Sequence, residues 1–175
     1  TVICCGIFAQ ETATHCSKRT QYSNQLKISP YVDEAQVLQQ KKYDVTFYKL
    51  NLNMTNTTTA LSGVVDIHAT ATQAIDSALL EFYSAFTIND IEVDGATTPY
   101  SRSGSLLSIP LNRAAGVPFV ISVDYAGTPP TAATNPLGGS GMTNASSPSW
   151  GNRVTWSLSE PFSTLEWFPC KQDLK

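Results

Sequence analysis

The 175-residue sequence contains few charged side chains and no long uninterrupted apolar stretch. Because a helix that crosses a bilayer needs roughly 20 predominantly apolar residues, the sequence predicts no transmembrane segment. Charged residues make up 14% of the chain and the formal net charge is −3, which gives no cationic footprint for a polyanion. We therefore expect neither a nucleic acid nor an anionic membrane surface as a partner.

Cysteine is also scarce, and the four cysteines fall into two groups. Cys4 and Cys5 lie in residues 1–10, a short apolar stretch with small residues towards its end, which is typical of the end of a secretory signal peptide. The alternative is a buried N-terminal strand. The signal-peptide interpretation predicts a secreted, periplasmic or cell-surface protein, in which Cys16 and Cys170 either form a disulfide or remain two unrelated thiols.

Helical periodicity is confined to residues 31–40, where Tyr31, Ala35 and Leu38 share one face and no helix breaker intervenes. From Tyr43 onwards, apolar and polar residues alternate in short segments separated by turn residues. We expect strands over residues 43–54, 61–70, 77–86, 87–94, 106–111, 117–125 and 153–158. The predicted fold is all-β, an antiparallel β-sandwich with a short N-terminal helical lead-in.

The alternation also assigns faces within the predicted strands. Tyr43, Val45 and Phe47 alternate on one face, and the apolar phase then shifts by one residue at Phe47-Tyr48, which predicts a bulge or a change of buried face at that point. Further along, Leu80 and Phe82 share one face, while Glu81 shares the opposite face with Leu79 and Tyr83.

Turn residues mark the connections between strands. Asp94-Gly95 predicts a hairpin turn, because both of its central positions need a positive φ, and Tyr100 with residues 106–111 should supply the returning strand. Residues 127–151 are rich in glycine and proline and show no periodicity, so we expect a long functional or mobile loop there. The predicted division of the chain is a signal remnant over 1–10, a lead-in over 11–42 and the sandwich over 43–175.

The strand predicted over residues 153–158 runs into the segment Glu160-Pro161, where proline ends strand pairing because it has no N–H. Phe168-Pro169-Cys170 and then Asp173 follow. This motif resembles the end of the N-terminal domain of the aminopeptidase N-like zinc metallopeptidases, the gluzincins. Residues 43–52 and 62–65 are similar to the first two strands of that domain, so the resemblance covers roughly residues 43–175.

The resemblance implies that this chain is a non-catalytic domain that caps the active-site cleft of an aminopeptidase. In such enzymes a zinc ion, held by a His-Glu-x-x-His helix and a distal glutamate, removes N-terminal residues from peptides. The sequence has only His15 and His68, too far apart for this motif, so it predicts no catalytic and no metal-binding residue in this chain. Zinc would belong to a catalytic domain further along the same polypeptide.

Glu160 is the predicted substrate-binding residue. The resemblance implies that the residue before this proline helps to hold the free α-amino group of a peptide. This group is mostly cationic at neutral pH because its pKa is about 8. The alternative is that Glu160 is an ordinary surface carboxylate at the end of a strand. Cys170, which follows Phe168-Pro169, is expected to be a buried structural thiol.

A second function remains open. Trp150, Trp156 and Trp167 either pack in the core and at a domain interface or form a platform on which sugar rings stack. The second possibility predicts a free-standing binding or adhesion module, for example for carbohydrate. His68 alternates with core positions and is expected to be a surface or edge residue.

Overall fold

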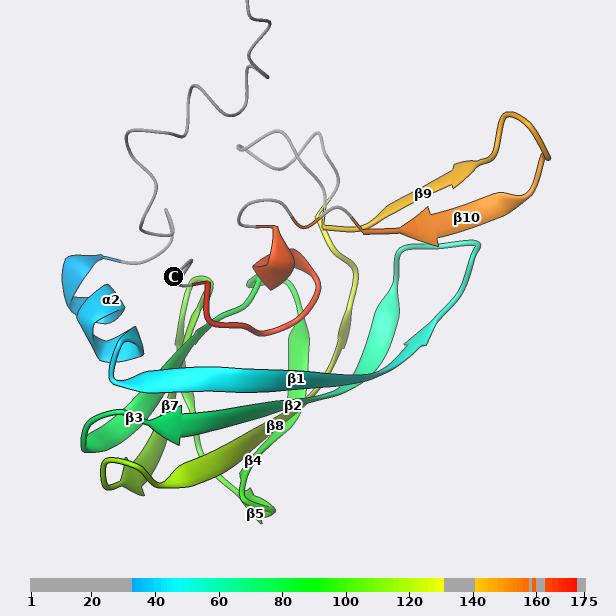
Figure 1. The fold of residues 1–175 in the computed structure, drawn as a ribbon. Coiled ribbons are helices and arrows are strands. Elements are labelled where there is room, and N and C mark those ends of the chain that lie inside the picture. The colour runs from blue at the N-terminus through cyan, green and yellow to red at the C-terminus, as the bar shows by residue number, and fades with distance from the viewer. Residues whose placement is uncertain (1–32, 131–140, 158, 160–162, 173–175) are drawn as a thin grey trace, which may run out of the picture.

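The computed structural model describes residues 33–130, 141–157, 159 and 163–172 (Figure 1). A five-stranded sheet in the order β1-β2-β8-β4-β5 and a three-stranded sheet in the order β3-β7-β6 enclose the core, and β9 and β10 form a separate hairpin. All of these pairings are antiparallel, which confirms the predicted all-β sandwich. The strands are β1 (Tyr43–Met54), β2 (Leu61–Ala71), β3 (Ile75–Glu81), β4 (Thr87–Val93), β5 (Ala96–Thr97), β6 (Ser101–Ser103), β7 (Leu106–Arg113), β8 (Pro118–Gly127), β9 (Thr143–Ser146) and β10 (Arg153–Trp156).

The core follows the alternation of the sequence in the central strands. In β8 the four alternate residues Phe119, Ile121, Val123 and Tyr125 are buried, as predicted. The neighbouring β2 contributes Val65, Ile67 and Ala69, and the facing sheet contributes Leu80, Leu107 and Ile109. Burial of each large apolar side chain stabilises the fold by roughly 1.5–3 kcal/mol.

The helix α2 (Glu34–Gln40) lies within the segment predicted to be helical. It begins after Asp33 because of a capping box: the Asp33 carboxylate accepts a hydrogen bond from Gln36 N, and Gln36 Oε1 accepts one from Asp33 N, both at 2.8 Å. Gln39 Nε2 donates to the Ser77 carbonyl at 2.9 Å. This bond fixes the helix beside β3.

The predicted bulge in β1 is present, but it lies before Phe47. The pairing of β1 with β2 shifts between Val45 and Phe47. Phe47 was expected on the same face as Tyr43 and Val45. Instead it lies on the outer face of the sheet, 56% exposed, because the bulge precedes it. Tyr48 consequently packs against the core.

The Asp94-Gly95 turn is confirmed, with φ values of 51° and 80°. Its returning strand is not the predicted one, however, because β5 pairs with β4 while β7 pairs with β3 in the other sheet. β7 pairs with β3 because its apolar residues Leu107 and Ile109 are buried there, on the facing side of the core.

The predicted loop over residues 127–151 contains regular structure. Gly127 completes β8, and β9 pairs with β10. No sequence pattern predicts β9, since Thr-Asn-Ala-Ser shows no apolar alternation. Val154 and Trp156 of β10 are exposed by 41% and 44%, so this strand stands outside the core. Leu158, predicted as its end, and residues 131–140 lie outside the described residues.

Candidate functional site

The predicted substrate-binding residue Glu160 lies outside the described residues, but residues before and after it are described. Ser159 Oγ accepts a hydrogen bond from Trp167 Nε1 at 2.8 Å. Ser163 is buried, and the short 3-10 helix η1 (Thr164–Glu166) follows it directly. The chain is therefore anchored immediately before Glu160 and again three residues after it.

The segment 163–172, which we call the C-terminal segment, packs into the sandwich rather than forming a tail (Figure 1). The Leu165 carbonyl accepts from Tyr83 N at 2.8 Å, and the Trp167 carbonyl accepts from the Tyr125 hydroxyl at 2.7 Å. Leu165 and Phe168 belong to the core cluster. These contacts fix the C-terminal segment against the sandwich.

Cys170 is a buried free thiol, as predicted for a structural cysteine. Burial, with a smaller contribution from the charge of Glu81, raises the pKa of the Cys170 thiol well above its ordinary value. Because the thiolate is the nucleophilic form, this residue is unsuited to nucleophilic catalysis. Cys16, its possible disulfide partner, lies outside the described residues.

Glu81 shares the face of β3 opposite Leu80, as the alternation predicts, yet this second face is buried as well. Its side chain is 0% exposed. Its two carboxylate oxygens accept hydrogen bonds from Gln40 Nε2 and Gln172 Nε2, each at 3.3 Å. The C-terminal segment covers the outer face of β3, and for this reason both faces of the strand are buried. The near-continuous apolar run around Glu81 was the available signal, since a strand that is buried on both faces loses its alternation.

Two tyrosines and a lysine complete this buried polar cluster. Lys171 Nζ donates to the Tyr43 carbonyl at 2.8 Å, and Lys171 N donates to the Tyr48 hydroxyl at 3.0 Å. The Tyr43 hydroxyl donates to the Leu79 carbonyl. Burial raises the pKa of both tyrosines. The cluster links the start of β1, the end of β3 and the C-terminal segment. Its role is to hold these three parts of the chain together.

Within the ranges that the structure describes, no group of three or more His, Cys, Asp or Glu side chains could hold a metal ion. His68 lies on the outer face of β2, where its ring is 5.4 Å from that of Phe47 and lines a shallow hollow together with Thr46, Asp94 and Val120. His15 lies outside the described residues. In this same part of the chain, no helix has the length and hydropathy needed to cross a membrane.

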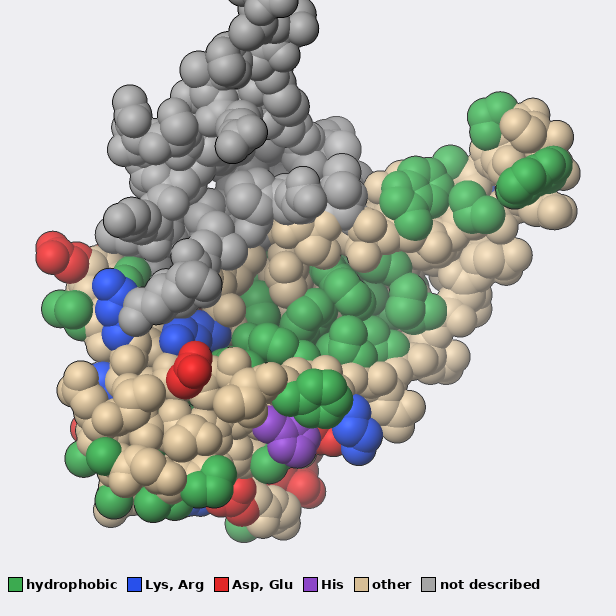
Figure 2. All heavy atoms as spheres, in the orientation of Figure 1, with side chains coloured by type: hydrophobic (Ala, Val, Ile, Leu, Met, Phe, Trp, Pro, Cys, Tyr) green, Lys and Arg blue, Asp and Glu red, His purple; other side chains and the backbone are tan. Residues whose placement is uncertain are grey.

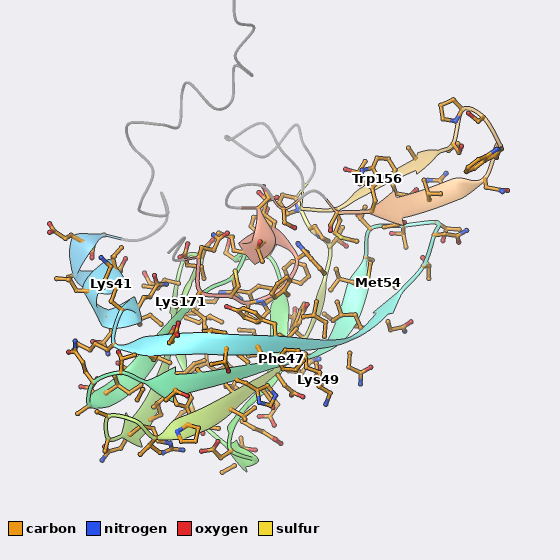
Figure 3. All side chains as sticks on the ribbon, in the orientation of Figure 1. Lys41, Phe47, Lys49, Met54, Trp156 and Lys171 are labelled. Atoms are coloured by element: carbon orange, nitrogen blue, oxygen red, sulfur yellow. The ribbon has the colours of Figure 1, made fainter. Side chains whose placement is uncertain are left out.

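The tryptophans do not form one platform. Trp150 is 81% exposed between β9 and β10, at the far end of the projecting hairpin, and Trp156 is 44% exposed on β10 (Figure 3). Trp167 is half-buried and stacks edge-on against Phe168. Trp167 therefore packs within this chain, whereas packing of Trp150 at a domain interface stays a prediction.

Comparison with known proteins finds its matches among solved structures. No protein-family model matches the chain, and no curated protein sequence matches it. The M1 zinc metallopeptidase from Deinococcus radiodurans, in a variant bound to a Tyr-Ser-Ala substrate, superposes with a TM-score of 0.64 and 24% identity over 77% of this chain. Leukotriene A4 hydrolase from yeast, in complex with bestatin, superposes with a TM-score of 0.59 and 19% identity over 89% of this chain.

The matched region is only part of each of those proteins. This chain spans 30% of the Deinococcus metallopeptidase and 24% of the yeast hydrolase. The expected resemblance to a zinc metallopeptidase is thereby confirmed in the fold: the sandwich has the architecture of one portion of an M1 zinc metallopeptidase.

Proposed function

We propose that this chain is the non-catalytic N-terminal domain of a zinc aminopeptidase and that it caps the active-site cleft of a catalytic domain in the same polypeptide. The observation that carries the proposal is the likeness over 77% of this chain to a fraction of a zinc metallopeptidase. The packing of the C-terminal segment supports it, because Phe168 and Cys170 of the motif that resembles the end of the aminopeptidase domain belong to the core cluster.

In this proposal Glu160 binds the free N-terminus of a peptide substrate. A fixed carboxylate favours a cationic α-amino group, so that only the first peptide bond reaches the zinc. Solved structures of M1 zinc metallopeptidases that resemble this chain are bound to a Tyr-Ser-Ala substrate, L-arginine or L-tryptophan, all of which carry an α-amino group. Zinc and the attacking water would be supplied by the catalytic domain, and this chain alone should be inactive.

The first test is the coding sequence beyond Lys175. The proposal requires a His-Glu-x-x-His motif followed by a distal glutamate, and a stop codon or an unrelated domain there would refute it. In the full polypeptide, Glu160→Ala should raise KM for a dipeptide amide with a free amine by about tenfold. Glu34→Ala, on exposed helix surface, is the matched control and should leave KM unchanged.

The proposed location is outside the cytoplasm, on the basis of residues 1–10. N-terminal sequencing of the mature protein tests this: cleavage after Ala9 should leave Gln10 as the first residue. Recovery of the protein in the cytoplasm with residues 1–10 intact would contradict it.

A second candidate function is supported by one observation. Trp150 is 81% exposed on a projecting hairpin, a position from which an aromatic ring can stack on a sugar. This alternative predicts that calorimetric titration with oligosaccharides gives a heat of binding that Trp150→Ala abolishes. An absence of heat with the unaltered chain would eliminate it.

A further inference from the structure

One face of β1 carries an apolar row that continues past the core. Tyr48, Leu50, Leu52 and Met54 alternate along the strand after the bulge, so their side chains share one face of the sheet. Tyr48 and Leu52 pack against the core cluster, which identifies this face as the inner one. Opposite Leu50, the paired residue Val65 of β2 is completely buried. The row is therefore a continuation of the core face and not a scatter of surface residues.

In the described part of the chain, the C-terminal segment covers only the start of this row. The C-terminal segment reaches Tyr48, through the bond from Lys171 N and through Phe168, whose ring centroid is 5.6 Å from that of Tyr48. Beyond that point Leu50 is 39% exposed and Met54 41% exposed. Figure 2 shows hydrophobic side chains gathered between β1 and the hairpin. An inner sheet face that is left open in this way marks an interaction surface.

The outer face of the same strand has an ordinary surface character. Lys49 forms an ion pair with Asp66 at 3.1 Å, and Phe47 lies against His68. Figure 3 shows Phe47, Lys49 and Met54 along this strand. The two faces of β1 therefore differ, and Phe47 and Leu50 make a matched pair of exposed apolar residues on opposite faces.

We infer that the adjoining catalytic domain of the same polypeptide packs on the open end of the apolar row. This surface, which we call the seat, consists of Leu50 and Met54 with the half-buried Leu52. The inference rests on the proposed function and adds to it the surface that joins the two domains. The partner's matching surface would be apolar and uncharged, since the row itself carries no charged side chain.

Two observations favour this occupant over others. The C-terminal segment meets the first residue of the row, because Lys171 N donates to the Tyr48 hydroxyl, so a domain that follows this segment is tethered within reach of the row. A domain tethered at that point has an effective concentration of the order of millimolar at the row. The proteins that share this fold also have about 70% or more of their chain outside the matched region.

Methionine oxidation tests the inference directly, because the sequence has only two methionines. Met54 lies in the row and is 41% exposed, whereas Met142 is buried in the core and serves as an internal control. In the 175-residue chain, peroxide should oxidise Met54 at least about tenfold faster than Met142. In the full polypeptide the oxidation of Met54 should slow towards that of Met142. An unchanged rate at Met54 in the full polypeptide would overturn the inference.

A matched pair of substitutions provides the second measurement. The full polypeptide would carry a protease site directly after Lys175 and be cleaved after folding. Leu50→Asp should then make the two fragments separate at least about tenfold faster on gel filtration, because it buries a charge in the interface. Phe47→Asp, on the opposite face of β1, should leave the rate unchanged. Equal rates for the two variants would refute the proposed seat.

The remaining outcomes are also decisive. If the 175-residue chain forms a dimer that Leu50→Asp dissolves while the nicked full polypeptide is unaffected, the occupant is a second copy and the inference is wrong. If the coding sequence contains no catalytic domain, the proposed function itself fails, and this is known before any variant is made. Failure of the seat alone leaves the aminopeptidase assignment untouched.

Discussion

Glu81 and Cys170 exchange two backbone hydrogen bonds, from Glu81 N to the Cys170 carbonyl at 2.7 Å and from Cys170 N to the Glu81 carbonyl at 3.0 Å. This isolated bridge attaches the C-terminal segment to β3 and buries both side chains. The position of the C-terminal segment therefore depends on contacts with residues far from it in sequence.

Replacement of Glu81 by alanine should destabilise the fold strongly. The change would remove the acceptor shared by Gln40 and Gln172 and leave their buried amides without that partner. An unsatisfied buried polar group costs about 1–3 kcal/mol, so we expect the free energy of unfolding to fall by roughly 2 kcal/mol or more. Urea denaturation measures this free energy. Glu92→Ala, at a half-buried position on β4, is the control and should change it by less than about 0.5 kcal/mol.

The Cys170 thiol should resist alkylation in the folded protein. Its raised pKa disfavours the thiolate, and the side chain is buried. We expect iodoacetamide at pH 8 to modify Cys170 at least about a hundredfold faster in urea than in buffer, as measured by peptide mass spectrometry. Rapid labelling of the native protein would show that the C-terminal segment detaches readily.

The same shift makes stability depend on alkaline pH. The folded protein keeps the Cys170 proton where the unfolded chain releases it, so the stabilising contribution is complete below the ordinary pKa of 9.0. It is lost as the pH rises from that value through the raised folded pKa, with a slope of at most about 1.4 kcal/mol per pH unit for one group. Denaturation of Cys170→Ser between pH 8 and pH 10 should show a shallower decline. An identical decline would assign the effect to the buried tyrosines.

Gly63 is irreplaceable for a geometric reason. Its φ is 147°, and a Cβ at this position would clash with the Asn51 carbonyl oxygen on the paired strand. Gly63→Ala should therefore cost about 3 kcal/mol or more and disturb the pairing of β1 with β2. Gly104→Ala, where φ is 57° and nothing lies near the added carbon, should cost only about 1 kcal/mol. Equal losses would contradict the clash, and thermal denaturation measures both.

The sequence predicts the strands whose two faces differ and misses those whose faces are alike. In β8, alternate burial from Phe119 to Tyr125 follows the pattern directly because one face meets the core. The burial of Glu81 depends on the C-terminal segment, which is far away in sequence and covers the second face of β3, so its only local signal was the apolar run around it. β9 was missed because side-chain hydrogen bonds rather than apolar burial hold it. The assignment of Glu160 as a substrate-binding residue rests on the sequence motif alone.

The last prediction concerns those hydrogen bonds, which attach the projecting hairpin to the turn between β1 and β2. Thr155 Oγ1 is within hydrogen-bonding distance of the Thr55 and Thr58 carbonyls, at 2.9 and 3.2 Å, and Asn144 Nδ2 donates to the Asn56 carbonyl at 2.7 Å. Thr155→Val keeps the shape of the side chain and removes its hydroxyl, so the hairpin should loosen while the sandwich remains folded.

The measurement is limited proteolysis together with thermal denaturation. Because the hairpin lies outside the core, we expect cleavage within residues 147–152 to accelerate about fivefold, with a change in Tm of no more than a few degrees. Thr143→Val, on the other strand of the hairpin and opposite Trp156, is the matched control and should not change the cleavage rate. If both variants were cleaved alike, the hairpin would be held by its own two-stranded pairing and not by the turn beneath it.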